Sequence, residues 1–173
     1  PLNEGPQILK HGKDVFVVYS CGQSWLDTYK LSYLRLKDPD ADLLDPKSWI
    51  KSDKPVFEGT DQVFGVGHAS FTTSPDDREH YIYYHTKKER KPGWKRDIRL
   101  QKFTFDASGV PCFGKPLPVS EKLPLPSGTA HPVKVKPMSE LEKDFTQLSS
   151  TARPYTYWFW MNGNITKEGI TKD

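Results

Sequence analysis

The sequence contains no apolar run of about 20 residues, the length that a membrane-spanning helix requires, so a membrane is not an expected partner. Cysteine is scarce: Cys21 and Cys112 lack the spacing of a zinc site, and either two free thiols or one structural pair is compatible with them. Basic residues form no concentrated stripe, and the stretch at 87–91 is followed by Pro92 and Gly93, as in a solvated loop. Nucleic acid is therefore not an expected partner either.

Hydrophobic residues are also few, at 35% of the sequence, whereas aromatic residues reach 13%. This combination favours a sheet-rich protein with aromatic surfaces over a helical bundle. The 15 prolines and 12 glycines agree, because they punctuate short strands and long loops. The composition predicts an all-β fold.

Strand signals occur twice in the same order, about 65 residues apart, which is the spacing typical of propeller blades. Each copy has a short run, an apolar strand, a long alternating strand and a short edge segment. The expected strands are 7–10, 15–19, 29–36 and 55–57, then 69–73, 81–85, 98–105 and 111–113. A β-sandwich would also supply eight strands but would not need them to repeat in order. We therefore predict two blades of a β-propeller.

The rest of the sequence has a different character. Prolines between 116 and 137 prevent regular strand pairing and predict an extended linker. An aromatic run at 155–161 precedes a turn, and Thr166 begins a capped helix, which together predict a truncated βα unit. The chain begins without a methionine or signal peptide and stops within a pattern, so we expect it to be a piece of a longer protein.

Glu4 is the first candidate for chemistry. It is followed by Gly5 and Pro6, just before the inner strand of the first predicted blade, where a rigid turn would hold it at the mouth of the channel. A partly apolar channel would raise the pKa of its carboxyl group, as a general acid needs. The alternative is an ordinary exposed glutamate in a terminal tail.

His68 and Arg99 are the other candidates. His68 precedes the inner strand of the second blade as Glu4 precedes that of the first, so both would converge on one axis, unless loop carbonyls simply satisfy the histidine. Alternation places Asp97, Arg99 and Gln101 on one strand face, where Arg99 would bind sugar hydroxyls or a carboxylate; a surface ion pair with Asp97 or Asp106 is the alternative. Several aromatic side chains either stack on sugar rings or pack between blades: Trp25, Trp49, Tyr83, Tyr84 and Trp94.

These motifs, in this order, resemble glycoside hydrolase family 43, and most closely its α-L-arabinofuranosidase-like members. The similarity covers residues 2–128 and rests on the segments at 3–9, 15–20, 67–76, 96–99 and 103–105. It implies a five-bladed propeller that cleaves terminal arabinofuranosyl or xylosyl residues with inversion. Glu4 would be the general acid, Arg99 a substrate contact, and His68 a substrate contact that helps to hold a calcium ion through water. No other cofactor is expected.

The resemblance also implies what the chain lacks. The general base and the aspartate that raises the pKa of the acid belong to earlier blades, so the missing N-terminal blades are expected partners and the chain alone is expected to be inactive. The tail at 153–173 resembles the start of family 106 α-L-rhamnosidases. The implied organisation is a propeller part at 1–128, a linker at 129–152 and a truncated barrel start at 153–173, in a secreted or periplasmic protein. A propeller that binds carbohydrate without cleaving it, or a purely protein-binding propeller, is the alternative.

Overall fold

The structure is a computed structural model that describes residues 2–129 of the chain. The chain divides into the units Pro1–His131 and Pro132–Asp173, and the described residues belong to the first. The expected βα unit at 153–173 and the linker at 129–152, apart from its first residue, therefore lie outside the described residues. Within the described residues, no helix is long and apolar enough to cross a membrane.

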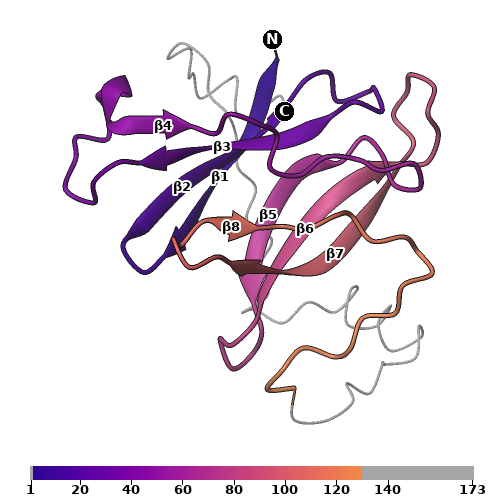
Figure 1. Ribbon diagram of the computed structural model, residues 1–173. Helices are drawn as coiled ribbons and strands as arrows, with labels where there is room; N and C mark the ends of the chain where they lie inside the picture. The colour runs from indigo at the N-terminus through magenta and orange to yellow at the C-terminus, as the bar shows by residue number, and fades with distance from the viewer. Residues whose placement is uncertain (1, 130–173) are drawn as a thin grey trace, which may run out of the picture. The chain divides into compact units, whose positions relative to one another are not determined.

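The first sheet has four antiparallel strands that follow one another in chain order (Figure 1). They are β1 (Asn3–His11), β2 (Asp14–Cys21), β3 (Lys30–Leu36) and β4 (Trp49–Lys51). Gly12 closes the tight β1–β2 turn with a φ of +57°, a conformation that glycine adopts without steric cost. The β2–β3 connection is longer and carries Trp25.

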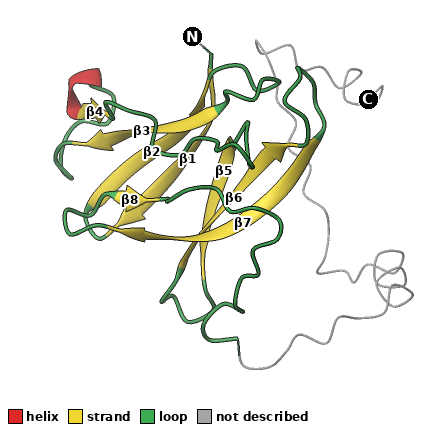
Figure 2. Ribbon diagram, turned by 45° about the vertical axis from the view of Figure 1, so that its right-hand side comes forward, coloured by secondary structure: helices red, strands yellow, loops and turns green. Residues whose placement is uncertain are grey.

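The second sheet repeats this order. It consists of β5 (Gly67–Thr73), β6 (His80–Lys87), β7 (Arg96–Phe105) and β8 (Pro111–Cys112), again antiparallel and in sequence. In the described part of the chain the helical content is one short 3₁₀ turn, η1 (Pro46–Ser48), seen in red in Figure 2. The all-β prediction and the repeated four-strand unit are confirmed.

The predicted edge strand at 55–57 of the first sheet is wrong. The outer strand is β4, which pairs Trp49 with Leu36, while Phe57 forms a single bridge to Leu31. The chain leaves the ladder between these two points, where Pro55 has no N–H to donate to a neighbouring strand. The edge therefore pairs with β3 in two short pieces.

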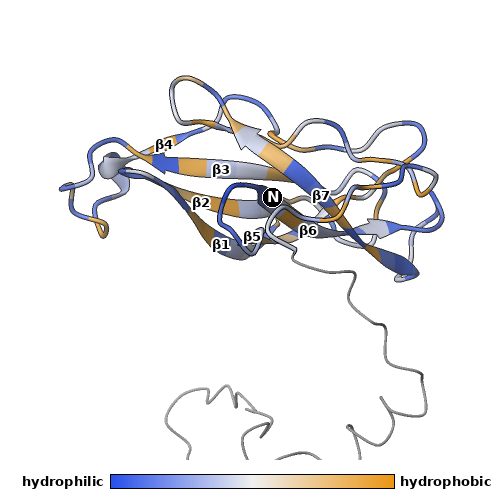
Figure 3. Cartoon of the chain, turned by 90° about the horizontal axis from the view of Figure 1, so that it is seen from below, coloured by the Kyte–Doolittle hydropathy of each residue, from blue (hydrophilic) through white to orange (hydrophobic). Residues whose placement is uncertain are grey.

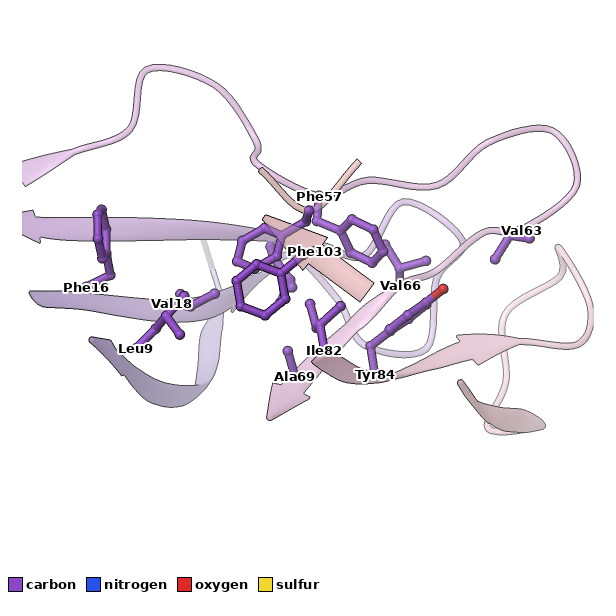
Figure 4. Close-up of a cluster of buried hydrophobic side chains, with 12 residues drawn as sticks. Leu9, Phe16, Val18, Phe57, Val63, Val66, Ala69, Ile82, Tyr84 and Phe103 are labelled. Atoms are coloured by element: carbon purple, nitrogen blue, oxygen red, sulfur yellow. The ribbon is translucent and has the colours of Figure 1, made fainter. Parts of the chain in front are cut away.

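One hydrophobic cluster lies between the two sheets and joins them (Figure 4). Leu9, Phe16 and Val18 enter it from the first sheet, and Ile82 and Tyr84 enter it from the second. Parts of the strands alternate apolar and polar residues, visible as orange and blue segments in Figure 3, whereas β2 and β6 bury residues on both faces. Both cysteines, at positions 21 and 112, are free.

Candidate active site

Glu4 lies in a bulge of β1 rather than in a terminal tail. The pairing of β1 with β2 runs from Gln7 with Val18 to Glu4 with Ser20, so β1 has one residue more than β2 between these pairs. Gly5, within the bulge, adopts the left-handed conformation with a φ of +57°. A bulge of this kind bends the strand and redirects a side chain, which is why bulges are frequent beside active sites.

The second sheet contains the same irregularity at the same place. Gly67 pairs with His85 and Ser70 pairs with Tyr83, which again leaves one extra residue in the inner strand. His68 takes the left-handed conformation here, with a φ of +52°. A side chain other than glycine rarely adopts this backbone, and such strain concentrates at functional sites. His68 thus occupies the place of the glycine in the first bulge, one position beyond that of Glu4.

The two bulges touch. A Cβ atom on Gly5 would lie 3.1 Å from the Cε1 and Nδ1 atoms of the His68 ring. The His68 N–H donates to the Ser20 hydroxyl at 2.7 Å, which joins β5 to β2. The structure therefore brings Glu4 and His68 together, as the repeat predicted. Within residues 2–129 the imidazole of His68 donates no hydrogen bond to a loop carbonyl.

Tyr29 holds the Glu4 carboxylate. Its hydroxyl donates to Glu4 Oε1 at 2.7 Å, and this bond lowers the pKa of the Glu4 carboxyl because it favours the charged form. Partial burial acts in the opposite direction and is the weaker influence. Burial is also the main reason that the pKa of Tyr29 is raised above its ordinary value. The expected upward shift of the Glu4 pKa is thus not produced by the described residues.

The Tyr29 ring packs against Gly67 and His85, which are cross-strand partners in the second sheet. A Cβ atom on Gly67 would lie 2.3 Å from Tyr29 Cε1, so only glycine leaves room for the ring. His85 stacks on Tyr29 with the ring centroids 5.3 Å apart and the planes 4° from parallel. Burial, with help from the nearby Arg96 guanidinium, lowers the pKa of His85 to about 4, so this imidazole is neutral at pH 7. A neutral ring can pack in this half-buried place without a counter-ion.

Arg96 supplies the positive charge of the site. Its guanidinium contributes to the shifted pKa values of Glu4, Tyr29 and His85. Its Nη2 donates to the Ser24 carbonyl at 2.7 Å, in the β2–β3 connection, and its Nε has no partner among the described residues. A groove beside it is lined by residues of β5, β6 and β7, including His68, His85 and Ile98.

Arg99 lies elsewhere. Its Nε donates to the Thr86 hydroxyl at 3.0 Å and its Nη1 donates to the Leu117 carbonyl at 3.1 Å. It shares a face of the second sheet with Asp97 and Gln101, as alternation predicted. No hydrogen bond in the described part of the chain links it to Glu4 or His68. It also forms no ion pair there, because Asp97 pairs with Lys88 at 2.8 Å.

The described residues provide one carboxylate at this site. The groups that shift the Glu4 pKa are Tyr29, Ser24, His68 and Arg96, and none of them is acidic. Among residues 2–129, no three side chains of the metal-binding types lie close enough together to hold an ion. A water-mediated ion near His68 stays a prediction.

The sequence of the two blades has known relatives. The family described as glycosyl hydrolases family 43 matches residues 1–111, which contain both bulges and the residues around them. The chain belongs to this family. An extracellular exo-α-(1→5)-L-arabinofuranosidase of Streptomyces avermitilis is 38% identical over 124 residues, covering 67% of this chain and 25% of the relative. The α-L-arabinofuranosidase B of Pyricularia oryzae is 33% identical over 143 residues, covering 78% of this chain and 27% of the relative.

A solved structure of an α-L-arabinofuranosidase from Lactobacillus brevis matches this chain with a TM-score of 0.65 and 36% sequence identity. The match covers 70% of this chain and 39% of that protein. The two sheets are thus two blades of a five-bladed propeller. The chain spans about a quarter of the length of the curated relatives it matches.

Sequence reasoning missed Tyr29 and Arg96 as members of the site. Arg96 starts β7 and Tyr29 directly precedes β3, so both lie at the strand ends nearest to Glu4. Their positions in the chain would have found them. In an antiparallel blade the first and third strands both start beside the end of the second strand, so residues at the start of the third strand lie near the start of the first. Strand-face alternation, which singled out Arg99, carries no information about the end of the strand.

Proposed function

We propose that the chain forms two blades of a hydrolase that releases terminal α-L-arabinofuranosyl residues from oligosaccharides or polysaccharides, with β-xylosyl residues as the alternative sugar. Glu4 would donate the proton. The observation that carries this is the position of Glu4 on a bulge of the inner strand, oriented by Tyr29 and beside His68 and Arg96. The arabinofuranosidases among the relatives support the choice of sugar.

The reaction would invert the anomeric centre. The Glu4 carboxyl gives its proton to the glycosidic oxygen as the bond from that oxygen to the anomeric carbon breaks. A water adds to the opposite face of the anomeric carbon and loses a proton to a second carboxylate. The two carboxyl groups of an inverting glycosidase lie about 6.5–9.5 Å apart, which leaves room for the water. The described residues supply the acid, and the base has to come from another part of the propeller.

The lowered pKa of Glu4 means that another group has to favour its protonated form. A carboxyl group that acts as an acid has to be protonated, yet the hydrogen bond from Tyr29 favours the carboxylate. A second carboxylate brought close to Glu4 would raise its pKa, because two like charges at short distance oppose ionisation. The proposal therefore includes an aspartate outside residues 2–129 that approaches Glu4 in the complete propeller.

The substitution Glu4→Gln in the complete protein tests the assignment. Removal of a general acid costs about 10²–10⁴-fold in rate. The loss should be larger for an arabino-oligosaccharide than for p-nitrophenyl α-L-arabinofuranoside, since p-nitrophenolate leaves without protonation. Glu58→Gln, at an exposed carboxylate without a hydrogen-bond partner among the described residues, is the matched control. Equal activity of the Glu4→Gln and wild-type proteins on the oligosaccharide would reject Glu4 as the acid.

The ionised state of Glu4 favours one alternative, a propeller that binds carbohydrate without cleaving it. In that case the complete protein would bind arabino-oligosaccharides in a calorimeter but release no arabinose.

The remaining parts of the proposal are a water-held ion near His68, a linker at 129–152, a rhamnosidase-like start at 153–173 and a place outside the cytoplasm. The extracellular Streptomyces relative supports the last of these.

A further inference from the structure

Two tryptophans lie together at the same end of the blades as Glu4. Trp25 belongs to the β2–β3 connection and Trp94 to the β6–β7 connection, so each blade contributes one ring. The ring centroids are 5.9 Å apart and the planes meet at 50°. Trp94 is 65% exposed, although tryptophan is among the side chains that gain most from burial. The pair lines a shallow surface together with Pro92 and Gly93.

A buried lysine fixes the two connections to each other. Lys87, only 5% exposed, donates from Nζ to the Trp25 carbonyl at 2.6 Å and to the Gly93 carbonyl at 2.8 Å. The Gly93 N–H donates to the Trp25 carbonyl at 3.0 Å. A charged group is costly to bury and is retained where hydrogen bonds compensate for the lost water. The tryptophan pair therefore rests on a rigid support.

Arg96 connects this pair to the site of Glu4. Its guanidinium lies over the Trp94 ring, 4.7 Å from the centroid, and donates to the carbonyl of Ser24, the residue before Trp25. The same guanidinium and the Ser24 side chain both contribute to the lowered pKa of Glu4. Arg96 thus contacts the tryptophan pair and also influences the Glu4 carboxylate.

We propose that Trp25 and Trp94 form a stacking platform for a further sugar unit of the carbohydrate chain whose terminal bond Glu4 cleaves. A sugar ring offers an apolar C–H face to an aromatic ring and hydroxyl groups at its edge. Ion pairs of the same β6–β7 segment, Lys88 with Asp97 and Lys95 with Glu89, surround the aromatic surface with polar groups. Aromatic surfaces with a few polar groups at the edge are typical of ligand sites.

The platform makes the enzyme sensitive to chain length, an inference that rests on the proposed function. In the complete protein, Trp94→Ala should lower kcat/KM for α-(1→5)-linked arabinotetraose about tenfold, mainly through KM, in line with the free energy of one aromatic contact. Activity on p-nitrophenyl α-L-arabinofuranoside, which has a single sugar, should fall by a clearly smaller factor. Trp94→Phe should retain most of the activity on arabinotetraose, because it keeps an aromatic ring.

Trp49→Ala is the matched control. Trp49 pairs with Leu36 at the opposite end of β3 from the site, so its loss should leave the ratio of the two substrates unchanged. An equal loss on both substrates in Trp94→Ala would mean that Trp94 acts through Arg96 on the acid, and would overturn the platform. No change on either substrate would overturn it as well.

A binding measurement separates the platform from the catalytic proposal. Arabinotetraose should quench the tryptophan fluorescence of the Glu4→Gln protein, and the affinity should fall about tenfold in Glu4→Gln/Trp94→Ala. If the wild-type protein binds arabinotetraose in this way but does not hydrolyse it, the proposed function fails and the platform stands. If the wild-type protein hydrolyses arabinotetraose while Trp94→Ala leaves its affinity unchanged, the platform fails alone.

Discussion

Tyr29 has the largest influence on the pKa of Glu4 among the described residues. Its ring packs against Gly67, which leaves space for it, and stacks on His85, and its hydroxyl donates to the carboxylate. Its position is set by several close contacts rather than by one. Small changes around this ring should therefore appear in the titration of Glu4.

Tyr29→Phe should raise the pKa of Glu4, because the hydrogen bond that stabilises the carboxylate is lost while the partial burial of Glu4 is kept. A ¹³C NMR titration of the Glu4 carboxyl carbon measures the change. Tyr33→Phe removes a hydroxyl that has no partner in the described part of the chain and should leave the pKa of Glu4 unchanged. A Glu4 pKa that stays constant or falls in Tyr29→Phe would contradict the role given to the hydroxyl.

At the scale of elements, the segment after β8 is held against the β5–β6 turn by acidic side chains. The Ser127 N–H donates to Glu79 at 2.9 Å, and its hydroxyl donates to Asp76 at 2.6 Å. Gly128 lies so close that a Cβ atom there would come within 2.7 Å of Asp76 Cβ. Hydrogen bonds to charged groups are the stronger ones, so this attachment depends on both carboxylates staying ionised.

The attachment should weaken in acid. The hydrogen bond from Lys102, followed by that from Tyr81, lowers the pKa of Glu79 to about 2 from its ordinary value of 4.5. A group with a lowered folded-state pKa stabilises the fold above the unfolded value and loses this contribution as the pH falls toward the folded value. Hydrogen exchange at the Ser127 amide should therefore lose its protection between about pH 4.5 and 2, beyond the intrinsic pH dependence of exchange.

Glu79→Gln separates this effect from general acid unfolding. Glutamine still offers an oxygen to the Ser127 N–H but does not titrate, so much of the pH dependence of protection should disappear from this window. The pKa of Asp76 is also lowered, chiefly by the hydrogen bond from Ser127, so Asp76 would account for any pH dependence of protection that remains. Amides of β2, which lie in the other sheet, serve as the internal reference. An unaltered pH profile at Ser127 would rule out Glu79 as the titrating group.

At the scale of the molecule, the two blades share one core. Phe57 is 1% exposed and contacts Tyr84 and Phe113 edge to face, with centroids 4.8 and 6.1 Å away. It follows the first sheet in sequence but packs against two residues of the second. The blades should therefore unfold as one unit rather than one after the other.

Phe57→Ala should lower the free energy of unfolding by about 3–5 kcal/mol, because a large buried ring is lost and the cavity is not refilled. Chemical denaturation, followed separately by near-ultraviolet and far-ultraviolet circular dichroism, should show coincident transitions at lower denaturant. Leu44→Ala, at a side chain that is 90% exposed, should change the free energy by less than about 0.5 kcal/mol. Two separate transitions in either protein would contradict a shared core.

The sequence by itself determined the repeated strand order, because alternation and turn residues are local properties that each strand carries with it. It also singled out Glu4 and His68, because both lie near the start of the inner strand of a blade, although the structure makes His68 equivalent to Gly5 rather than to Glu4. Only the tertiary structure decided that Arg96 rather than Arg99 lies beside Glu4, that Tyr29 lowers its pKa, and that Trp25 meets Trp94. Arg96 and Trp94 belong to the second blade and meet residues of the first, and the Tyr29 ring, although it belongs to the first blade, packs against Gly67 and His85 of the second. The distances of these contacts therefore depend on how one sheet packs on the other.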